Sequence, residues 1–159
     1  MYTFSYDKAT ALLVGLFTKQ DAGPVDFDRQ LEAMRRLDED ALLAGKAPSY
    51  VLVIDANYPA PDASTRKRLA AEWGALRSPT FAAAAVLGSA EHRGAMRAVL
   101  WLLPAESSRR LTLHDDFEDA ARWLGSLRGR PLGRLHALFH ETRSLAPSLR
   151  KMRAALPAA

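Results

Sequence analysis

The run at residues 50–54 constrains the fold of this chain more than any other segment, because its letters YVLVI are apolar without interruption. A strand that faces water on one side alternates apolar and polar residues, whereas a strand covered on both faces does not. The run therefore predicts a buried strand of a parallel or mixed sheet with helices around it. Asp55 ends the run, and the loop 56–61 leads to a polar helix start at Asp62.

Two apolar runs, at residues 2–5 and 11–18, flank a polar segment near the N-terminus. This arrangement predicts a β-hairpin with Asp7 as a turn residue. Gly15 interrupts the second run, which predicts either a β-bulge or a close backbone contact.

An amphipathic helix follows, because apolar residues recur from Phe27 to Ala41 at spacings typical of one helical face. Either Asp26 or Asp28 is expected to cap its start, and Gly45 stands where a left-handed C-terminal residue belongs.

Further along the chain, residues 81–87 and 109–114 read as strands, each followed by a helix. Ser89 is expected to cap the first of these helices, and Asp115 with Glu118 forms a capping box for the second. The alternation from residue 24 onward predicts an α/β fold with a mixed, mostly parallel sheet of about five strands and helices packed on it. We expect this domain to span residues 1–127, with the hairpin at the edge of the sheet.

Residues 128–159 differ in charge from the domain and predict a basic, amphipathic helical tail. They contain seven Arg or Lys and one acid, against fifteen basic and seventeen acidic residues in 1–127. Pro147 is expected to divide the tail into two short helices. The tail can fold back on its own domain, dock into a partner or bind an anionic surface, and its apolar face favours the first two. The residues expected to make this contact are Leu132, Leu135, Phe139 and Leu149.

Composition excludes several classes of protein and site. Cysteine is absent, which removes disulfides, thiol nucleophiles and thiolate metal sites. The chain has no apolar run long enough to span a membrane and no signal peptide, so we expect a bacterial-type cytoplasmic protein. The sequence points to no cofactor. His136 and His140 are spaced for a metal, but solvated polar side chains are the better interpretation.

Several segments together resemble the SpoIIAA-like branch of the STAS superfamily, the STAS/SEC14-type domain. They are the N-terminal hairpin, the apolar strand VLVID with its polar helix start, the stretch GSAEHRGAMRAVLWLL, and a short strand followed by HDDFEDAARWL. The resemblance covers about residues 1–127 and implies a regulatory or carrier protein. In the anti-sigma-factor antagonists of that superfamily, a serine in a motif like Asp-Ser-Ser-Gly is phosphorylated. The corresponding residues here are Asp62-Ala63-Ser64-Thr65, so the resemblance implies a phosphorylation candidate at Ser64 alone.

Residues near the carboxyl ends of the strands form a second candidate site. Ligands of open α/β sheets bind there, and the free N–H groups at helix starts favour anions. Helix capping is the simpler explanation of the same side chains. The candidates for an anionic ligand are Asp55, Asp62, Ser64, Thr65, Ser89 and Arg93.

No set of nucleophile, base and orienting residue is recognisable in the sequence. Trp73, Trp101 and Trp123 each lie on an expected helix, where packing in a core or groove is the simpler interpretation, and a nucleic-acid partner is not indicated. We therefore expect a non-enzymatic regulatory or scaffolding protein that acts by protein–protein contact, with phospho-control at Ser64. The alternative is a carrier or sensor of a small anionic ligand or lipid.

Overall fold

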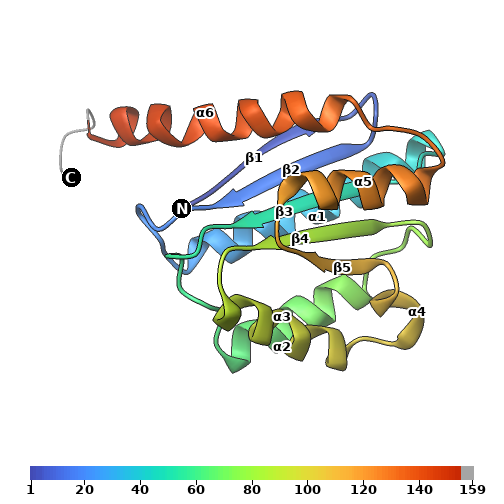
Figure 1. Cartoon of the computed structure of the whole chain (residues 1–159), viewed down its shortest axis with the longest axis horizontal. Coiled ribbons are helices and arrows are strands. Elements are labelled where there is room, and N and C mark those ends of the chain that lie inside the picture. The colour runs from blue at the N-terminus through green and yellow to red at the C-terminus, as the bar shows by residue number, and fades with distance from the viewer. Residues whose placement is uncertain (155–159) are drawn as a thin grey trace.

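The structure is a computed structural model that describes the backbone of residues 1–154 and the side chains of residues 1–145. Within that range the chain forms five strands and six helices (Figure 1). The strands are β1 (Tyr2–Asp7), β2 (Leu12–Phe17), β3 (Ser49–Ile54), β4 (Ala82–Leu87) and β5 (Leu111–His114). The helices are α1 (Val25–Ala44), α2 (Ala63–Gly74), α3 (Ala90–Leu102), α4 (Ala105–Ser108), α5 (Phe117–Arg128) and α6 (Arg134–Ala154).

The strands form one sheet in the order β1-β2-β3-β4-β5. Strand β1 pairs with β2 in the antiparallel sense, and the other three pairs are parallel. This confirms the predicted α/β fold with a mixed, mostly parallel sheet. The strand order never reverses, so the sheet lacks the switch point that creates a ligand crevice in doubly wound folds.

Helices cover both faces of the sheet and give the molecule three layers (Figure 1). Side chains of α1, α2 and α3 join one apolar core with alternate strand residues such as Tyr50 and Leu52. Side chains of α5 and α6 join a second core with the intervening residues, such as Val51. Because successive side chains of a strand point to opposite faces, β3 needs apolar residues at every position, as its sequence indicated.

The N-terminal hairpin forms as predicted. Asp7 accepts a hydrogen bond at 2.9 Å from the N–H of Ala9, which stabilises the turn. Gly15 makes the predicted close contact rather than a bulge, since the register of the two strands is unbroken. A Cβ atom placed on Gly15 would lie 2.4 Å from the hydroxyl oxygen of Tyr2, so only glycine leaves room for that ring.

The start of α1 differs from the expectation, although its end does not. Gly45 terminates the helix in the left-handed conformation, with φ of 61°. Neither Asp26 nor Asp28 caps the helix, because the N-cap residue is Pro24. Asp26 is instead buried and accepts hydrogen bonds from the N–H of Tyr2 at 2.9 Å and the hydroxyl of Tyr58 at 3.0 Å.

Two further expectations near the C-terminus are wrong. The N-cap of α5 is Asp116, not Asp115, because Asp116 has the extended backbone of a cap and accepts the N–H of Asp119 at 2.8 Å. Pro147 does not divide the tail, since α6 runs through it as a single helix. A helix that is held along one side by the sheet can continue past the single backbone hydrogen bond that proline removes.

Candidate functional site

The start of α2 contains three of the six anion-site candidates, and its cap is Asp62. A carboxylate oxygen of Asp62 accepts the N–H of Thr65 at 2.7 Å, and this hydrogen bond lowers the pKa of Asp62. Ser64 is therefore not the helix cap. It lies inside the first turn, and its side chain is exposed. The Ser64 hydroxyl is therefore accessible to a modifying enzyme. The N–H of Thr65, which could otherwise bind an anion, already donates to Asp62.

The start of α3 contains two more candidates, which are also engaged within the protein. Ser89 caps the helix by accepting the N–H of His92 at 3.2 Å, and its hydroxyl lies 2.6 Å from Nδ1 of the same histidine. Arg93 forms an ion pair with Asp115, in the loop after β5. Ser89 thus stabilises the start of its own helix, and Arg93 links α3 to the loop after β5.

The serine–histidine contact does not form a catalytic triad with any residue that the structure describes. A triad needs a third group that hydrogen-bonds the second imidazole nitrogen and orients the ring. Nε2 of His92 is buried and has no hydrogen-bond partner within residues 1–145. The same serine oxygen also accepts a backbone N–H, as a helix cap does.

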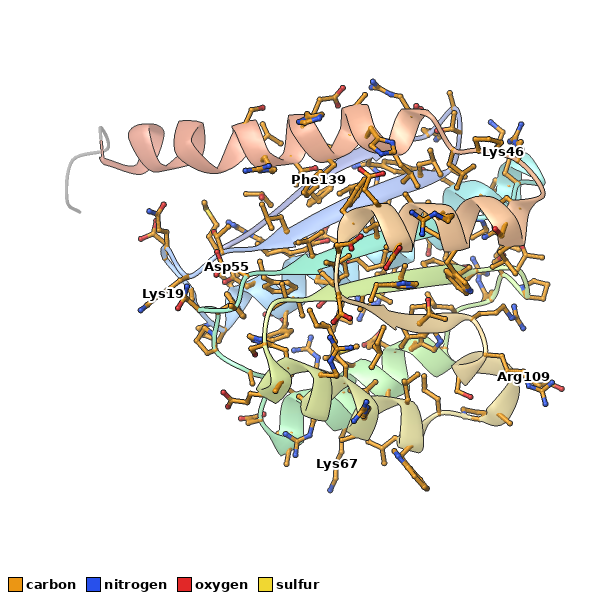
Figure 2. All side chains as sticks on the ribbon, viewed as in Figure 1. Lys19, Lys46, Asp55, Lys67, Arg109 and Phe139 are labelled. Atoms are coloured by element: carbon orange, nitrogen blue, oxygen red, sulfur yellow. The ribbon has the colours of Figure 1, made fainter. Side chains whose placement is uncertain are left out.

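Asp55, the sixth candidate, lies apart from the helix starts in an open hollow at the carboxyl ends of β2 and β3. Figure 2 shows Asp55 and Lys19 near that edge of the molecule, with Phe139 on α6 above them. The hollow has a volume of about 870 Å³. Its lining residues are Leu16, Thr18, Lys19, Gln20, Val53, Asp55, Asn57, Phe139 and Arg143.

Two cations and one carboxylate determine the electrostatics of this hollow. Asp55 accepts the N–H of Asn57 at 2.9 Å, which turns its carboxylate toward its own loop. Arg143 lies over the ring of Phe139, with 5.6 Å between the guanidinium carbon and the ring centre. Lys19 and Arg143 are exposed, and water screens charges at such positions, so the hollow can attract an anion only weakly.

The residues expected to dock a partner through the tail pack mainly on the protein's own sheet. Leu135 is fully buried, and Phe139 stacks on Phe117 with 4.2 Å between ring centres. Thr142 is also buried, and its hydroxyl lies 2.7 Å from the carbonyl of Leu138 in its own helix and 3.3 Å from the carbonyl of Val14 on β2. The structure thus shows the first of the three alternatives for the tail, folding back on the domain. Leu132 is half-buried beside this core, and Leu149 lies outside the residues whose side chains are described.

An exposed apolar surface that contains an aromatic side chain lies on α3, around Trp101. The side chain of Trp101 is 89% exposed and that of Leu102 is 53% exposed, so the expectation of core packing is wrong for this tryptophan. Trp73 is buried, and Trp123 packs against the second core. The spacing along the helix could have predicted this exposure. Trp101 follows the buried Val99 by two residues, and side chains two positions apart in a helix point to opposite faces.

An exposed basic residue lies close to Trp101 on α3. Arg97 precedes Trp101 by about one turn on the same helix and is exposed. Other exposed cations lie elsewhere on this half of the molecule: Figure 2 shows Lys67 pointing outward from α2 at the bottom of the view and Arg109 pointing outward at the right-hand edge. We call the surface formed by Arg97, Trp101 and Leu102 on α3 the Trp101 surface.

Metal-binding and membrane-spanning features do not emerge from the described part of the chain. Nε2 of His136 donates a hydrogen bond to the carboxylate of Glu118 at 3.0 Å, and residues 1–145 contain no group of three potential ligands that could hold a metal ion. Among the helices of residues 1–154, none combines the length and apolarity that crossing a membrane requires.

Comparison with protein-family models, with curated proteins and with solved structures finds no match for this chain. The proposals for its function therefore rest on the residues and geometry described above.

Proposed function

We propose that this protein is a non-enzymatic regulatory or scaffolding protein, and that the Trp101 surface binds a protein partner with an acidic, partly apolar face. One observation carries the proposal: a tryptophan that is 89% exposed beside a leucine that is 53% exposed. Tryptophan and arginine are enriched among the residues that contribute most to protein–protein binding. The exposed cation Arg97, one turn before Trp101, favours an acidic partner through charge complementarity.

The resemblance to the SpoIIAA-like branch of the STAS superfamily belongs to the same proposal. The antiparallel hairpin at the edge of a parallel sheet, followed by alternating helices and strands, supports it. That resemblance favours regulation by contact with another protein over catalysis.

An affinity capture with a matched control tests the proposed surface. The full chain is used as bait in three forms: wild type, Trp101→Ala, and Leu43→Ala. Leu43 is equally exposed, at 89%, but lies at the end of α1. Wild type and Leu43→Ala should capture the same protein, and the purified protein should bind Trp101→Ala at least about tenfold more weakly. Equal binding by all three forms, or no capture above the level of Trp101→Ala, contradicts the proposal.

Phosphorylation of Ser64 is the proposed control of this contact. The hydroxyl is exposed in the first turn of α2, where the helix dipole favours a phosphate. Arg66 already donates to the carbonyl of Pro61 at 2.9 Å, and Arg68 forms an ion pair with Asp28 at 2.6 Å. Lys67 is the neighbouring cation that remains for the phosphate, and its helix α2 packs against α3, which carries the Trp101 surface. A phosphate that engages Lys67 would therefore change the charge near the partner.

A pair of substitutions tests the phospho-control separately. Ser64→Asp should bind the captured partner more weakly than Ser64→Ala, because it adds negative charge beside a surface that recognises acids. Equal affinities of the two variants contradict phospho-control and leave the binding surface itself in place.

The second candidate function is binding of a small anionic ligand or lipid headgroup in the hollow beside Asp55. The convergence of Lys19 and Arg143 on this hollow supports it. Native mass spectrometry of freshly purified protein should then show a retained anion, and Lys19→Ala should lose it. A ligand-free wild-type spectrum counts against this function.

A further inference from the structure

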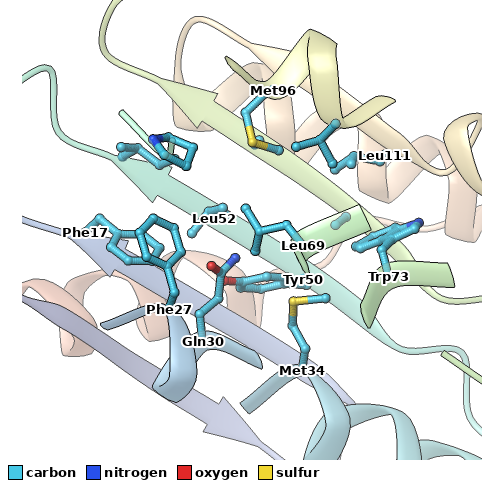
Figure 3. Close-up of a pocket in the computed structure, with 15 residues that line it drawn as sticks. Phe17, Phe27, Gln30, Met34, Tyr50, Leu52, Leu69, Trp73, Met96 and Leu111 are labelled. Carbon is cyan, nitrogen blue, oxygen red and sulfur yellow. The ribbon is translucent and has the colours of Figure 1, made fainter. Parts of the chain in front are cut away.

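A mostly apolar cavity lies between the sheet and helices α1, α2 and α3 (Figure 3). Its volume is about 40 Å³. That volume is several times the roughly 10–15 Å³ that one water molecule needs. Aromatic and aliphatic side chains form most of its wall, including Phe17, Trp73, Met34 and Met96. Helix α2 closes it on the side away from the sheet with Leu69 and Trp73.

One polar side chain of this wall has an unsatisfied oxygen. Gln30 on α1 is only 4% exposed, and its Oε1 atom has no hydrogen-bond partner among the described residues. Figure 3 shows its amide at the centre of the lining residues, beside Tyr50. A buried amide oxygen without a partner is costly, and native proteins contain few of them. An apolar residue would be more stable at this position, so the amide needs another explanation.

Two buried tyrosines lie close to this amide. The hydroxyls of Tyr2 and Tyr50 lie 3.1 Å apart, and Tyr50 lines the cavity together with Gln30. Oε1 of Gln30 is the buried oxygen of this wall that has no partner among the described residues. A hydroxyl group placed in the cavity can donate a hydrogen bond to it.

We infer that this cavity is a binding site for a small neutral molecule with an apolar body and one hydroxyl group, of the short-alcohol class. The hydroxyl donates to Oε1 of Gln30, while the carbon atoms contact the apolar wall. Charged ligands are excluded, because the wall offers no counter-charge within a buried site. The flexible thioethers of Met34 and Met96 allow the wall to adapt to the ligand's shape.

The site is independent of the proposed function. The Trp101 surface lies on the solvent face of α3, whereas the cavity contacts Met96 and Val99 on the buried face of the same helix. A partner that binds Trp101 neither needs nor occupies the cavity.

The experiment compares isopropanol with acetone, which have the same carbon skeleton and four non-hydrogen atoms each but differ in the hydroxyl donor. The full chain is labelled at its methionine methyl groups, and each probe is titrated while methyl NMR spectra are recorded. Isopropanol should cause saturable shifts of the Met34 and Met96 signals, with a dissociation constant weaker than about 0.05 mM, the ceiling for so small a ligand. Acetone should bind at least about tenfold more weakly, since its oxygen cannot donate to Gln30.

A Gln30→Met variant completes the test. It should retain the wild-type fold in its amide spectrum, unfold at a higher temperature, and lose the preference for isopropanol over acetone. Equal binding of the two probes to wild type overturns the inference. So does an absence of saturable shifts, or the detection of a bound water at these methyl groups that isopropanol does not displace.

Discussion

Gly88 packs so closely against Ala56 that a Cβ atom on Gly88 would lie 2.4 Å from the backbone nitrogen of Ala56. The N–H of Gly88 also donates to the carbonyl of Ile54 at 3.0 Å. The loops that leave β3 and β4 therefore meet backbone to backbone. This contact explains why position 88 is a glycine. The residue is required by close backbone packing and need not belong to a phosphate-binding loop.

Substitution of Gly88 by alanine should destabilise the protein, because the new methyl group meets backbone atoms that cannot rotate away. We expect the free energy of unfolding to fall by about 1–3 kcal/mol, the range for overpacked sites. Gly94→Ala is the matched control: Gly94 lies inside α3, and a Cβ there meets nothing within 4 Å. That change should raise stability by about 0.5–1 kcal/mol. Urea unfolding followed by circular dichroism measures both, and equal effects would contradict the packing argument.

The sequence was sufficient to predict the fold because two kinds of signal agree along most of the chain. The spacing of apolar residues indicates strands and helices, and Gly, Pro and capping residues mark where these elements begin and end. The uninterrupted run before Asp55 required a strand covered on both faces, and the structure provides helices on both. Capping positions were less predictable. Several acids or hydroxyls stand near each helix start, and only the extended backbone of Asp62 or Asp116 selects the cap among them.

The candidate sites were predicted less well, for reasons of three-dimensional placement. Side chains near the strand ends were expected to converge, yet Asp55 lines a hollow on the α6 side, Ser89 caps α3, and Arg93 pairs with Asp115. Local sequence does not show which face of a sheet a loop residue will approach. The cavity at Gln30 was not predicted either. A single polar residue on the apolar face of a helix is common, so Gln30 alone gave no reason to expect a cavity.

The buried carboxylate of Asp26 should contribute strongly to stability. It lies 3.1 Å from the amino group of Met1, and both groups are 1% exposed. Asp26→Asn removes the charge from this pair, which should lower the free energy of unfolding by about 3–5 kcal/mol. Asp28→Asn is the control, since Asp28 is 54% exposed and its ion pair with Arg68 should be worth less than about 1 kcal/mol. Similar losses in the two variants would show that burial does not matter here.

The same carboxylate should make stability depend on acidity. Burial opposes ionisation of Asp26, but hydrogen bonds from Gly23, Tyr2, the N-terminal amine and Tyr58 outweigh it and lower its pKa below the ordinary value of 3.8. A lowered folded-state pKa means that this stabilisation is complete above the ordinary value. It is lost as the pH falls through the ordinary value toward the folded-state pKa. Urea unfolding between pH 6 and pH 3 should show a shallower acid-side decline for Asp26→Asn than for wild type.

The C-terminal helix should be required for folding rather than only for partner binding. A chain that ends at Leu127 lacks Leu135 and Leu138, which are buried against β1 and β2. It also lacks Arg128, which donates to the Ser49 hydroxyl at 2.8 Å. We expect this chain to lose its near-ultraviolet circular dichroism and to bind hydrophobic dyes. Native spectra from the shortened chain would contradict the prediction.

A single substitution tests the packing of α6 on the sheet without shortening the chain. Leu135 is 0% exposed and Leu145 is 39% exposed on the same helix. Leu135→Ala should lower the free energy of unfolding by about 2–5 kcal/mol, because it leaves a cavity in the second core. Leu145→Ala should cost less than about 1 kcal/mol. Chemical unfolding of both variants gives the comparison, and equal costs would mean that the helix does not rest on the sheet through Leu135.

The exposure of Trp101 should dominate the quenching of the protein's fluorescence by acrylamide. Its side chain is 89% exposed, whereas Trp73 is 8% exposed and packs edge-on against Phe81 at 5.3 Å. Trp101→Phe should remove most of the quenchable emission and change the free energy of unfolding by less than about 0.5 kcal/mol. Trp73→Phe should do the reverse, leaving quenching nearly unchanged while costing about 1–3 kcal/mol through altered core packing. A Trp101→Phe variant that quenches like wild type would place this indole in a protected site and remove the observation on which the proposed partner surface rests.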